Sequence, residues 1–129
     1  MSLIRSLLAA LVLFLGVSGA FADTKWREFS PAAFAEAQAS RATIVVHVHA
    51  DWCPTCKAQQ PILDELSGEA ALRDVVLFKA DFDGEKDFLR SQRIARQSTI
   101  LVFKGADEVA RSVAETNRSR LRGAMRGSW

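Results

Sequence analysis

The fold of this chain is decided by the stretch Ala50-Asp51-Trp52-Cys53-Pro54-Thr55-Cys56-Lys57, which holds its only two cysteines. A pair at this spacing can form half of a four-thiolate metal cage, but no second cysteine pair exists to complete one. A structural disulfide is also a poor use of the spacing, because closing a very small loop removes little entropy from the unfolded chain. The sequence therefore favours reversible disulfide chemistry.

The residues around the pair predict that Cys53 lies at the start of a helix. Residues 43–50 are rich in Ile and Val and read as a buried strand that ends at Asp51. Pro54 then falls at the first helical position, where a missing N–H costs nothing. Unpaired backbone N–H groups at a helix start favour the thiolate of Cys53. The apolar face that this helix would lay on a sheet consists of Ala58, Ile62, Leu63 and Leu66.

The first residues predict where the protein works. Arg5 precedes an apolar run over residues 7–17, and Ala20-Phe21-Ala22 matches a small-residue cleavage site. We therefore expect a secretory signal peptide over residues 1–22, cleavage after Ala22, and a periplasmic or secreted location. A spanning helix needs roughly 20 apolar residues, so a permanent membrane anchor is the weaker alternative. Residues 23–129 are enough for one compact domain and too few for two.

The rest of the chain alternates between strand and helix patterns, which predicts an α/β domain. A turn over residues 105–107 joins the last two strands as a hairpin. The formal net charge is only +2 at pH 7, which gives no reason to expect nucleic acid or an anionic membrane as a partner. The predicted strands cover residues 25–29, 43–50, 75–81, 99–104 and 108–114, and the predicted helices cover 31–39, 54–66, 85–92 and 119–125.

This order of elements resembles the thioredoxin family over about residues 25–125. The resemblance implies a mixed sheet of four to five strands flanked by helices, a redox-active Cys53–Cys56 pair and no organic cofactor. It also implies that Cys53 is the exposed attacking cysteine and Cys56 the buried resolving one. Trp52 would shield the sulfurs and contact the partner. The segments that carry the resemblance are Ala50 to Cys53 with Cys56 and Lys57, Pro61 to Leu66, Lys79 to Asp83, and Thr99 to Gly105.

The pair Ser98-Thr99 departs from the family, whose members resemble one another in having a cis-proline before the threonine. A cis bond before serine costs about 2.5–4 kcal/mol, so the Gln97–Ser98 peptide is either trans or strained. In the family this loop pairs with the bound partner, which makes Pro54, Gln97, Ser98 and Thr99 candidate partner contacts. The Ser98 hydroxyl either hydrogen-bonds a cysteine sulfur or is tied to its own loop.

His47 is the second departure, because it stands where the family keeps a buried acid beneath the cysteines. That acid is thought to move protons for the resolving thiol, so His47 is a candidate proton relay. Lys79 matches a family lysine near the acid and would hold the imidazole neutral, with Lys57 as a second supporting residue. His49 lies on the same face of the strand. Either histidine is alternatively a satisfied core residue.

Three classes of function follow from these residues. Cys53 and Cys56 with one histidine, His47 or His49, could hold copper or zinc in a metal-delivery protein. A binding module with a vestigial cysteine pair is a further alternative. The signal peptide and the motif instead resemble the periplasmic reducing branch of the family, which implies client proteins with thiols or disulfides and a membrane thiol-electron transporter as donor. Pro54-Thr55 carries no positive charge to stabilise the Cys53 thiolate, which favours a reductant or a protein of intermediate potential.

Overall fold

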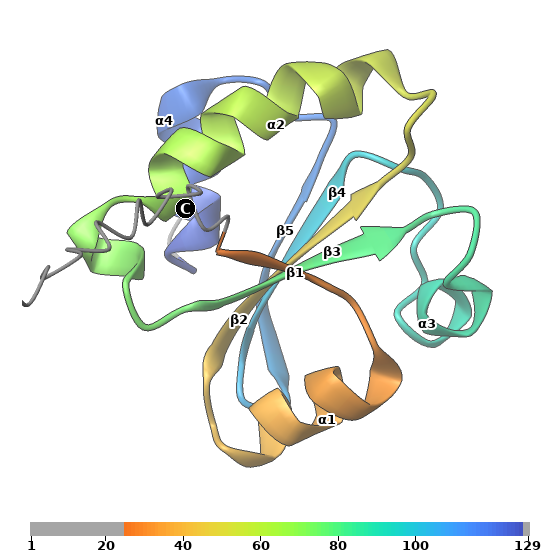
Figure 1. Ribbon diagram of the computed structural model, residues 1–129, viewed down its shortest axis with the longest axis vertical. Helices are drawn as coiled ribbons and strands as arrows, with labels where there is room; N and C mark the ends of the chain where they lie inside the picture. The colour runs from red at the N-terminus through yellow and green to blue at the C-terminus, as the bar shows by residue number, and fades with distance from the viewer. Residues whose placement is uncertain (1–24, 128–129) are drawn as a thin grey trace, which may run out of the picture.

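The computed structural model describes residues 25–127, which form a mixed β-sheet with helices on both of its faces (Figure 1). The predicted signal peptide, residues 1–22, lies outside the described residues. Within residues 25–127, no helix combines the length and apolar character needed to cross a membrane. In chain order the elements are β1 (Trp26–Glu28), α1 (Pro31–Ala39), β2 (Thr43–His49), α2 (Pro54–Ser67), the 3₁₀ turn η1 (Ala70–Leu72), β3 (Val76–Asp81), α3 (Lys86–Ser91), β4 (Thr99–Lys104), β5 (Asp107–Val113) and α4 (Arg118–Met125).

The five strands lie in the order β1-β3-β2-β4-β5. Strands β1 and β2 run parallel to β3, whereas β4 runs antiparallel to β2 and β5 antiparallel to β4. The predicted α/β fold with a mixed sheet is therefore confirmed. Strand β5 begins one residue earlier than predicted, because Gly105 at φ +59° and Ala106 alone make the turn from β4.

Strand β2 separates two hydrophobic clusters, because alternate side chains of a strand point to opposite faces of the sheet. Ile44, Val46 and Val48 pack toward α1 and α3 in a cluster dominated by phenylalanines. Val45 packs on the other face, toward α2 and α4. His47 shares the face of Val45, so the fold places its ring beneath α2. The large side chains of the second cluster are Leu63, Leu66, Leu72, Leu77, Ile100, Leu121 and Met125.

Helix α2 packs on the sheet through Leu63, Leu66 and the partly buried Ile62 of the predicted face, but not through Ala58. Cys56, Gln59, Leu63 and Leu66 are buried at helical spacing, whereas Ala58 is exposed. The prediction followed apolar residues only and so did not include Gln59, although a buried amide is stable when it is hydrogen-bonded. The corrected face matters for function because it places a polar side chain next to His47.

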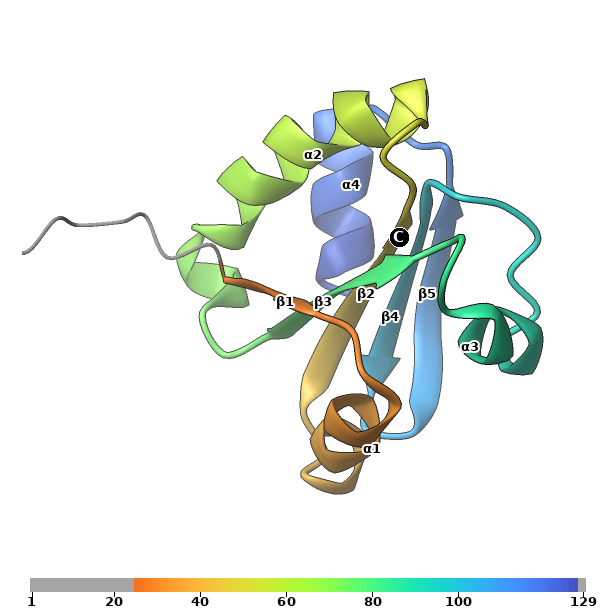
Figure 2. The same cartoon turned by 45° about the vertical axis from the view of Figure 1, so that its right-hand side comes forward.

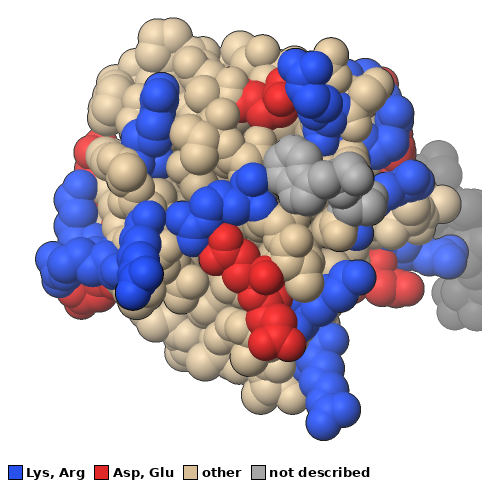
Figure 3. Space-filling model, turned by 180° about the vertical axis from the view of Figure 1, so that it is seen from behind, with Lys and Arg blue, Asp and Glu red and all other residues tan. Residues whose placement is uncertain are grey.

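Helix α4 lies beside α2 on the same face of the sheet (Figure 2). Leu121 and Met125 are buried there. At the rim of this contact, arginines of α4 form ion pairs with Glu69, which follows α2. Arg122 Nη2 lies 2.8 Å from Glu69 Oε1, and Arg118 Nη2 lies 3.8 Å from the same oxygen. On the face in Figure 3, basic and acidic side chains likewise lie next to each other. These ion pairs fix the C-terminal end of α2, while its N-terminal end carries the cysteines.

Candidate active site

Cys53 and Cys56 lie at the N-terminal end of α2, just after the C-terminal end of the central strand β2 (Figure 1). Both are free thiols. Cys53 is the N-cap residue, and its Sγ accepts the backbone N–H of Cys56 at 3.1 Å. Pro54 follows at the first helical turn. The predicted helix start at the cysteine pair is confirmed.

Both cysteines are buried, with Cys53 1% and Cys56 4% exposed. The expectation that Cys53 is exposed is therefore wrong for this conformation. The reason is local packing: the two thiols form a small cluster with Ala50, and the half-buried Phe82 packs against it. A partner sulfur has to displace part of this cover before it reaches Cys53.

The two thiols differ in acidity. Burial raises the pKa of Cys53, but hydrogen bonds from the Cys56 thiol, the Ser98 hydroxyl and the Cys56 backbone N–H outweigh it, so this pKa lies below its ordinary value. Burial raises the pKa of Cys56, and the interaction with Cys53 raises it further. Cys53 is thus the easier sulfur to ionise and Cys56 the harder one. This asymmetry is what an attacking and a resolving cysteine require.

Trp52 presents an apolar surface directly before the pair. Its side chain is 57% exposed, and its indole N–H donates to Asp83 Oδ2 at 2.7 Å. The hydrogen bond joins the start of α2 to the loop that follows β3. An exposed indole held in one orientation is well suited to contact a partner protein.

Ser98 lies directly under both sulfurs. Its Oγ is 3.1 Å from Cys53 Sγ and 3.1 Å from Cys56 Sγ, and the residue is fully buried. Of the two alternatives for this hydroxyl, the structure shows the contact with sulfur. No peptide bond within residues 25–127 is cis, so the Gln97–Ser98 peptide is trans. Ser98 instead takes φ +63°, a left-handed conformation that costs about 1–2 kcal/mol for a residue other than glycine.

The other predicted partner contacts divide by exposure. Pro54 is exposed and Gln97 half-buried, so both are near the surface that a partner would meet. Thr99 is 1% exposed, and its hydroxyl donates to Arg96 O at 2.7 Å. A partner contact through the Thr99 side chain is therefore wrong for this conformation.

His47 is fully buried beneath the site and pairs with Gln59 rather than with a sulfur. Its Nε2 lies 3.0 Å from Gln59 Oε1. The Gln59 amide nitrogen donates to Ser98 O and Glu115 O, so its oxygen has to accept from His47. His47 Nδ1 has no hydrogen-bond partner among the described residues. The path from His47 to the cysteines thus runs through Gln59 and the backbone of Ser98.

The His47 ring is neutral near pH 7. Its pKa is lowered from 6.5 to about 4, mainly by burial and in addition by the nearby His49 and Lys79, whereas the hydrogen bond to Gln59 acts in the opposite direction. The proposed effect of Lys79 is present, although burial is the larger cause. Gln59 was not predicted as a site residue, and neither were Phe82 and Asp83. The position of Gln59 three residues after Cys56 on the same helix face was the available signal.

A pocket of about 160 Å³ opens beside Cys56. His49 lies in its wall, with Nδ1 donating to Ala80 O at 3.3 Å and Nε2 3.7 Å from Asp51 Oδ1. The pocket gives the resolving cysteine a polar neighbourhood that includes both predicted supporting lysines. Its lining residues are His49, Ala50, Asp51, Cys56, Lys57, Gln60 and Lys79.

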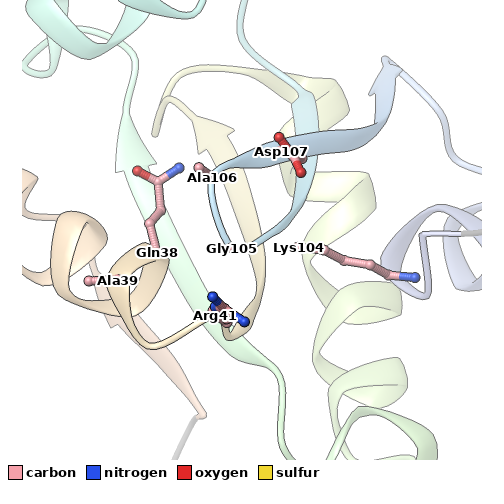
Figure 4. A pocket seen from close by; sticks show the side chains of 7 residues that line it. All are labelled: Gln38, Ala39, Arg41, Lys104, Gly105, Ala106 and Asp107. Carbon is pink, nitrogen blue, oxygen red and sulfur yellow. The ribbon is translucent and has the colours of Figure 1, made fainter.

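The metal alternative is not favoured. Among residues 25–127, no three His, Cys, Asp or Glu side chains come together in a group that could hold a metal ion. A pocket of about 390 Å³ lies at the far end of β4 from Ser98, between α1 and the β4–β5 turn (Figure 4). Its lining contains neither cysteine nor histidine: Gln38, Ala39, Arg41, Lys104, Gly105, Ala106 and Asp107.

The sheet, the helices on both of its faces and the cysteine pair at the start of α2 define a protein of thioredoxin-like fold with a dithiol site. The comparison with known families agrees, since the family model described as Thioredoxin matches residues 25–127. The chain belongs to the thioredoxin family.

Individual relatives share part of this chain. The "Thioredoxin-like protein" of Fusarium culmorum is 37% identical over 68 residues, 52% of this chain and 56% of that protein. "Thioredoxin C-2" of Corynebacterium nephridii is 36% identical over 78 residues, 60% of this chain and 71% of that protein. The crystal structure of Trxlp from Edwardsiella tarda EIB202 has a TM-score of 0.73 and 43% identity, covering 75% of this chain and 94% of that one. The chain spans about half the length of the Fusarium relative, and this match shows similarity of that part only.

Proposed function

We propose that this protein is a periplasmic or secreted thiol–disulfide oxidoreductase that exchanges a Cys53–Cys56 disulfide with client proteins. The observation that carries the proposal is the position of the pair: Cys53 caps the start of α2, and its Sγ accepts the backbone N–H of Cys56 at 3.1 Å, which favours the Cys53 thiolate. The directions of the two pKa shifts agree, since that of Cys53 is lowered and that of Cys56 is raised. One sulfur is ready to attack and the other is kept protonated until it is needed. The cysteine pair carries the electrons itself, so the reaction requires no organic cofactor.

In the reducing direction the exchange takes two steps. The Cys53 thiolate attacks one sulfur of a client disulfide, a Cys53–client bond forms, and the other client sulfur leaves as a thiolate. Cys56 then loses its proton to water and attacks Cys53 Sγ, which releases the second client sulfur as a thiolate. The cysteine pair loses two electrons, the client disulfide gains them, and the two client thiolates take protons from water.

The reducing direction is supported by the groups around Cys53. Reductants of this kind have potentials of about −270 mV and strong oxidants about −120 mV, and the oxidants owe theirs to a strongly stabilised thiolate. Here the hydrogen bonds that lower the Cys53 pKa come from neutral groups, the Cys56 thiol and N–H and the Ser98 hydroxyl. A donor is then required to reduce the pair again, and we propose a membrane thiol-electron transporter.

Equilibration of the protein with glutathione buffers tests activity and direction together. We expect a potential in the reducing half of the range above, and turnover of a disulfide substrate that is lost in Cys53→Ser. A Cys56→Ser variant should hold clients as mixed disulfides, and Cys53→Ser/Cys56→Ser is the matched control that should hold none. Wild-type protein without turnover would remove the proposal, and a potential near the oxidant end would reverse the direction.

The location is tested separately. Expressed from its own first residue in a bacterial host, the protein should be recovered from the periplasm or medium beginning at Asp23. A variant with Ala20→Arg and Ala22→Arg should keep its first residues because the cleavage site is lost. Recovery of uncut wild-type protein from the cytosol would contradict the proposed export and leave the thiol chemistry unaffected.

A further inference from the structure

A single hydroxyl serves two sulfurs in this site. Ser98 Oγ is 3.1 Å from each cysteine Sγ, within the range of hydrogen bonds to sulfur. The hydroxyl is held there by the backbone of its own residue. Ser98 N–H donates to Val48 O at 2.8 Å, and Ser98 O accepts from Ala114 N at 3.0 Å. Strand β2 and the end of β5 therefore position the oxygen, while its proton is free to rotate.

A hydroxyl carries one proton and two lone pairs, so it donates to one sulfur at a time and accepts from the other. In the reduced protein the Cys53 thiolate can only accept, and the protonated Cys56 can donate. Ser98 O–H therefore donates to Cys53 Sγ, while the single Cys56 S–H donates either to Ser98 Oγ or to Cys53 Sγ. Once Cys53 is bonded to a client it no longer carries the negative charge, and the forming charge is on Cys56.

We propose that Ser98 is a catalytic residue whose hydroxyl donates to Cys53 during attack on a client disulfide and then rotates to donate to Cys56 during resolution. The proposal rests on the proposed function, because it assigns a role in both steps of that exchange. Ser98 keeps its own proton throughout. The proton of Cys56 leaves to water, for which the pocket beside Cys56 provides a route.

Other titratable groups near the sulfurs do not take this position. The pocket wall beside Cys56 carries His49, Asp51, Lys57 and Lys79. On the other side, Asp83 accepts from the Trp52 indole. All of these charges stay in place when the Ser98 side chain is changed, so a difference in the pH profile of such a variant reports on the hydroxyl.

The two steps can be followed separately with dithiobis(nitrobenzoate), an aromatic disulfide that releases one coloured thiolate in each step. In stopped-flow mixing with the reduced protein, the first phase reports attack by Cys53 and the second reports resolution by Cys56. Both rates are measured across a pH series for wild type and for Ser98→Ala. Thiolate absorbance gives the pKa of Cys53 in the same samples.

Loss of a hydrogen bond to a charged sulfur should raise the Cys53 pKa by about one pH unit. Well below that pKa the variant has about tenfold less thiolate, but a thiolate of higher pKa is about threefold more nucleophilic, so the first phase slows about threefold. At pH values above the Cys53 pKa of both wild type and variant, the thiolate is fully formed in each, and the variant reacts about threefold faster. The second phase should slow about threefold below the Cys56 pKa for the same reason.

Two controls separate the hydroxyl from the fold. Ser98→Gly also lacks the hydroxyl but relieves the left-handed backbone, so it should match Ser98→Ala in both phases. Ser67→Ala removes a buried hydroxyl at the far end of α2, where it donates to Asp64 O, and should leave both phases unchanged.

Three results would overturn the proposal. One is wild-type pH profiles in both Ser98 variants, and another is equal slowing at every pH, which indicates a structural role. The third is a change in the first phase alone. In each case two phases remain, and the oxidoreductase assignment stands. Wild-type protein that releases no coloured thiolate, or only one per molecule, would instead remove the proposed function itself.

Discussion

Acid should destabilise this protein through one buried side chain. His47 is fully buried, and its pKa falls from 6.5 in the unfolded chain to about 4 in the folded protein. Between these values the unfolded state binds a proton that the folded state does not, so stability decreases as pH falls from 6.5 to 4. At 1.36 kcal/mol for each pH unit, the loss is about 3 kcal/mol, a large part of the 5–15 kcal/mol typical of a small domain.

The measurement is urea unfolding of the reduced protein between pH 7.5 and pH 4, monitored by circular dichroism. His47→Gln cannot be protonated, so its stability should change less over this range than that of wild type, by about 3 kcal/mol. The protein contains only two histidines, which makes His49→Gln the matched control. It keeps His47 and the burial that is the main cause of its low pKa, so it should retain most of the dependence on pH.

The protein also loses stability in acid through carboxylates whose pKa is lowered by arginine partners, such as Glu108 beside Arg111. Their folded pKa is depressed, so this contribution is present above their ordinary pKa and is lost as pH falls below it. It is common to all three proteins and cancels in the comparison. If wild type and His47→Gln lost stability in parallel, the reasoning about the buried imidazole would be refuted.

Three further predictions concern other parts of the molecule. Leu63→Ala removes a fully buried side chain of α2 and should lower the free energy of unfolding by about 2–5 kcal/mol, measured with urea; a loss under 1 kcal/mol would mean that the core is not packed as described. Asp83→Ala removes the acceptor of the Trp52 indole, so acrylamide should quench tryptophan fluorescence more strongly, whereas Asp87→Ala should leave quenching unchanged. In the proposed exchange the Cys56 proton leaves to water, so His47→Ala should not slow resolution of the mixed disulfide more than its formation; selective slowing of resolution in stopped-flow traces would instead support the relay through His47.

The elements could be predicted because their signals are local. The segment from Thr43 to His49 is rich in Ile and Val, Pro54 marks a helix start, and Gly105 marks a turn. Each of these signals depends on residues that are close together in the sequence. The family resemblance implied a mixed sheet, but the order of the strands could not be read from local signals, because neighbouring strands such as β1 and β3 are far apart in the sequence.

The arrangement of the site could be predicted only in part. The cysteine pair follows from its spacing, and the face of His47 follows from strand alternation. The burial of Gln59 could not be predicted from apolar periodicity, since its amide is stabilised by three groups from β2, the Ser98 loop and the segment before α4. The contact of one hydroxyl with both sulfurs depends on a left-handed backbone at Ser98, which no local pattern indicates.

The backbone of Ser98 also limits what evolution or design can place there. Proline is restricted to φ near −65°, so it cannot adopt the +63° of this position, and it lacks the N–H that binds Val48 O. Installing the usual family residue would thus demand a rebuilt loop rather than a swapped side chain. A Ser98→Pro substitution in this chain would combine backbone strain with the loss of the hydrogen bond to Val48 O.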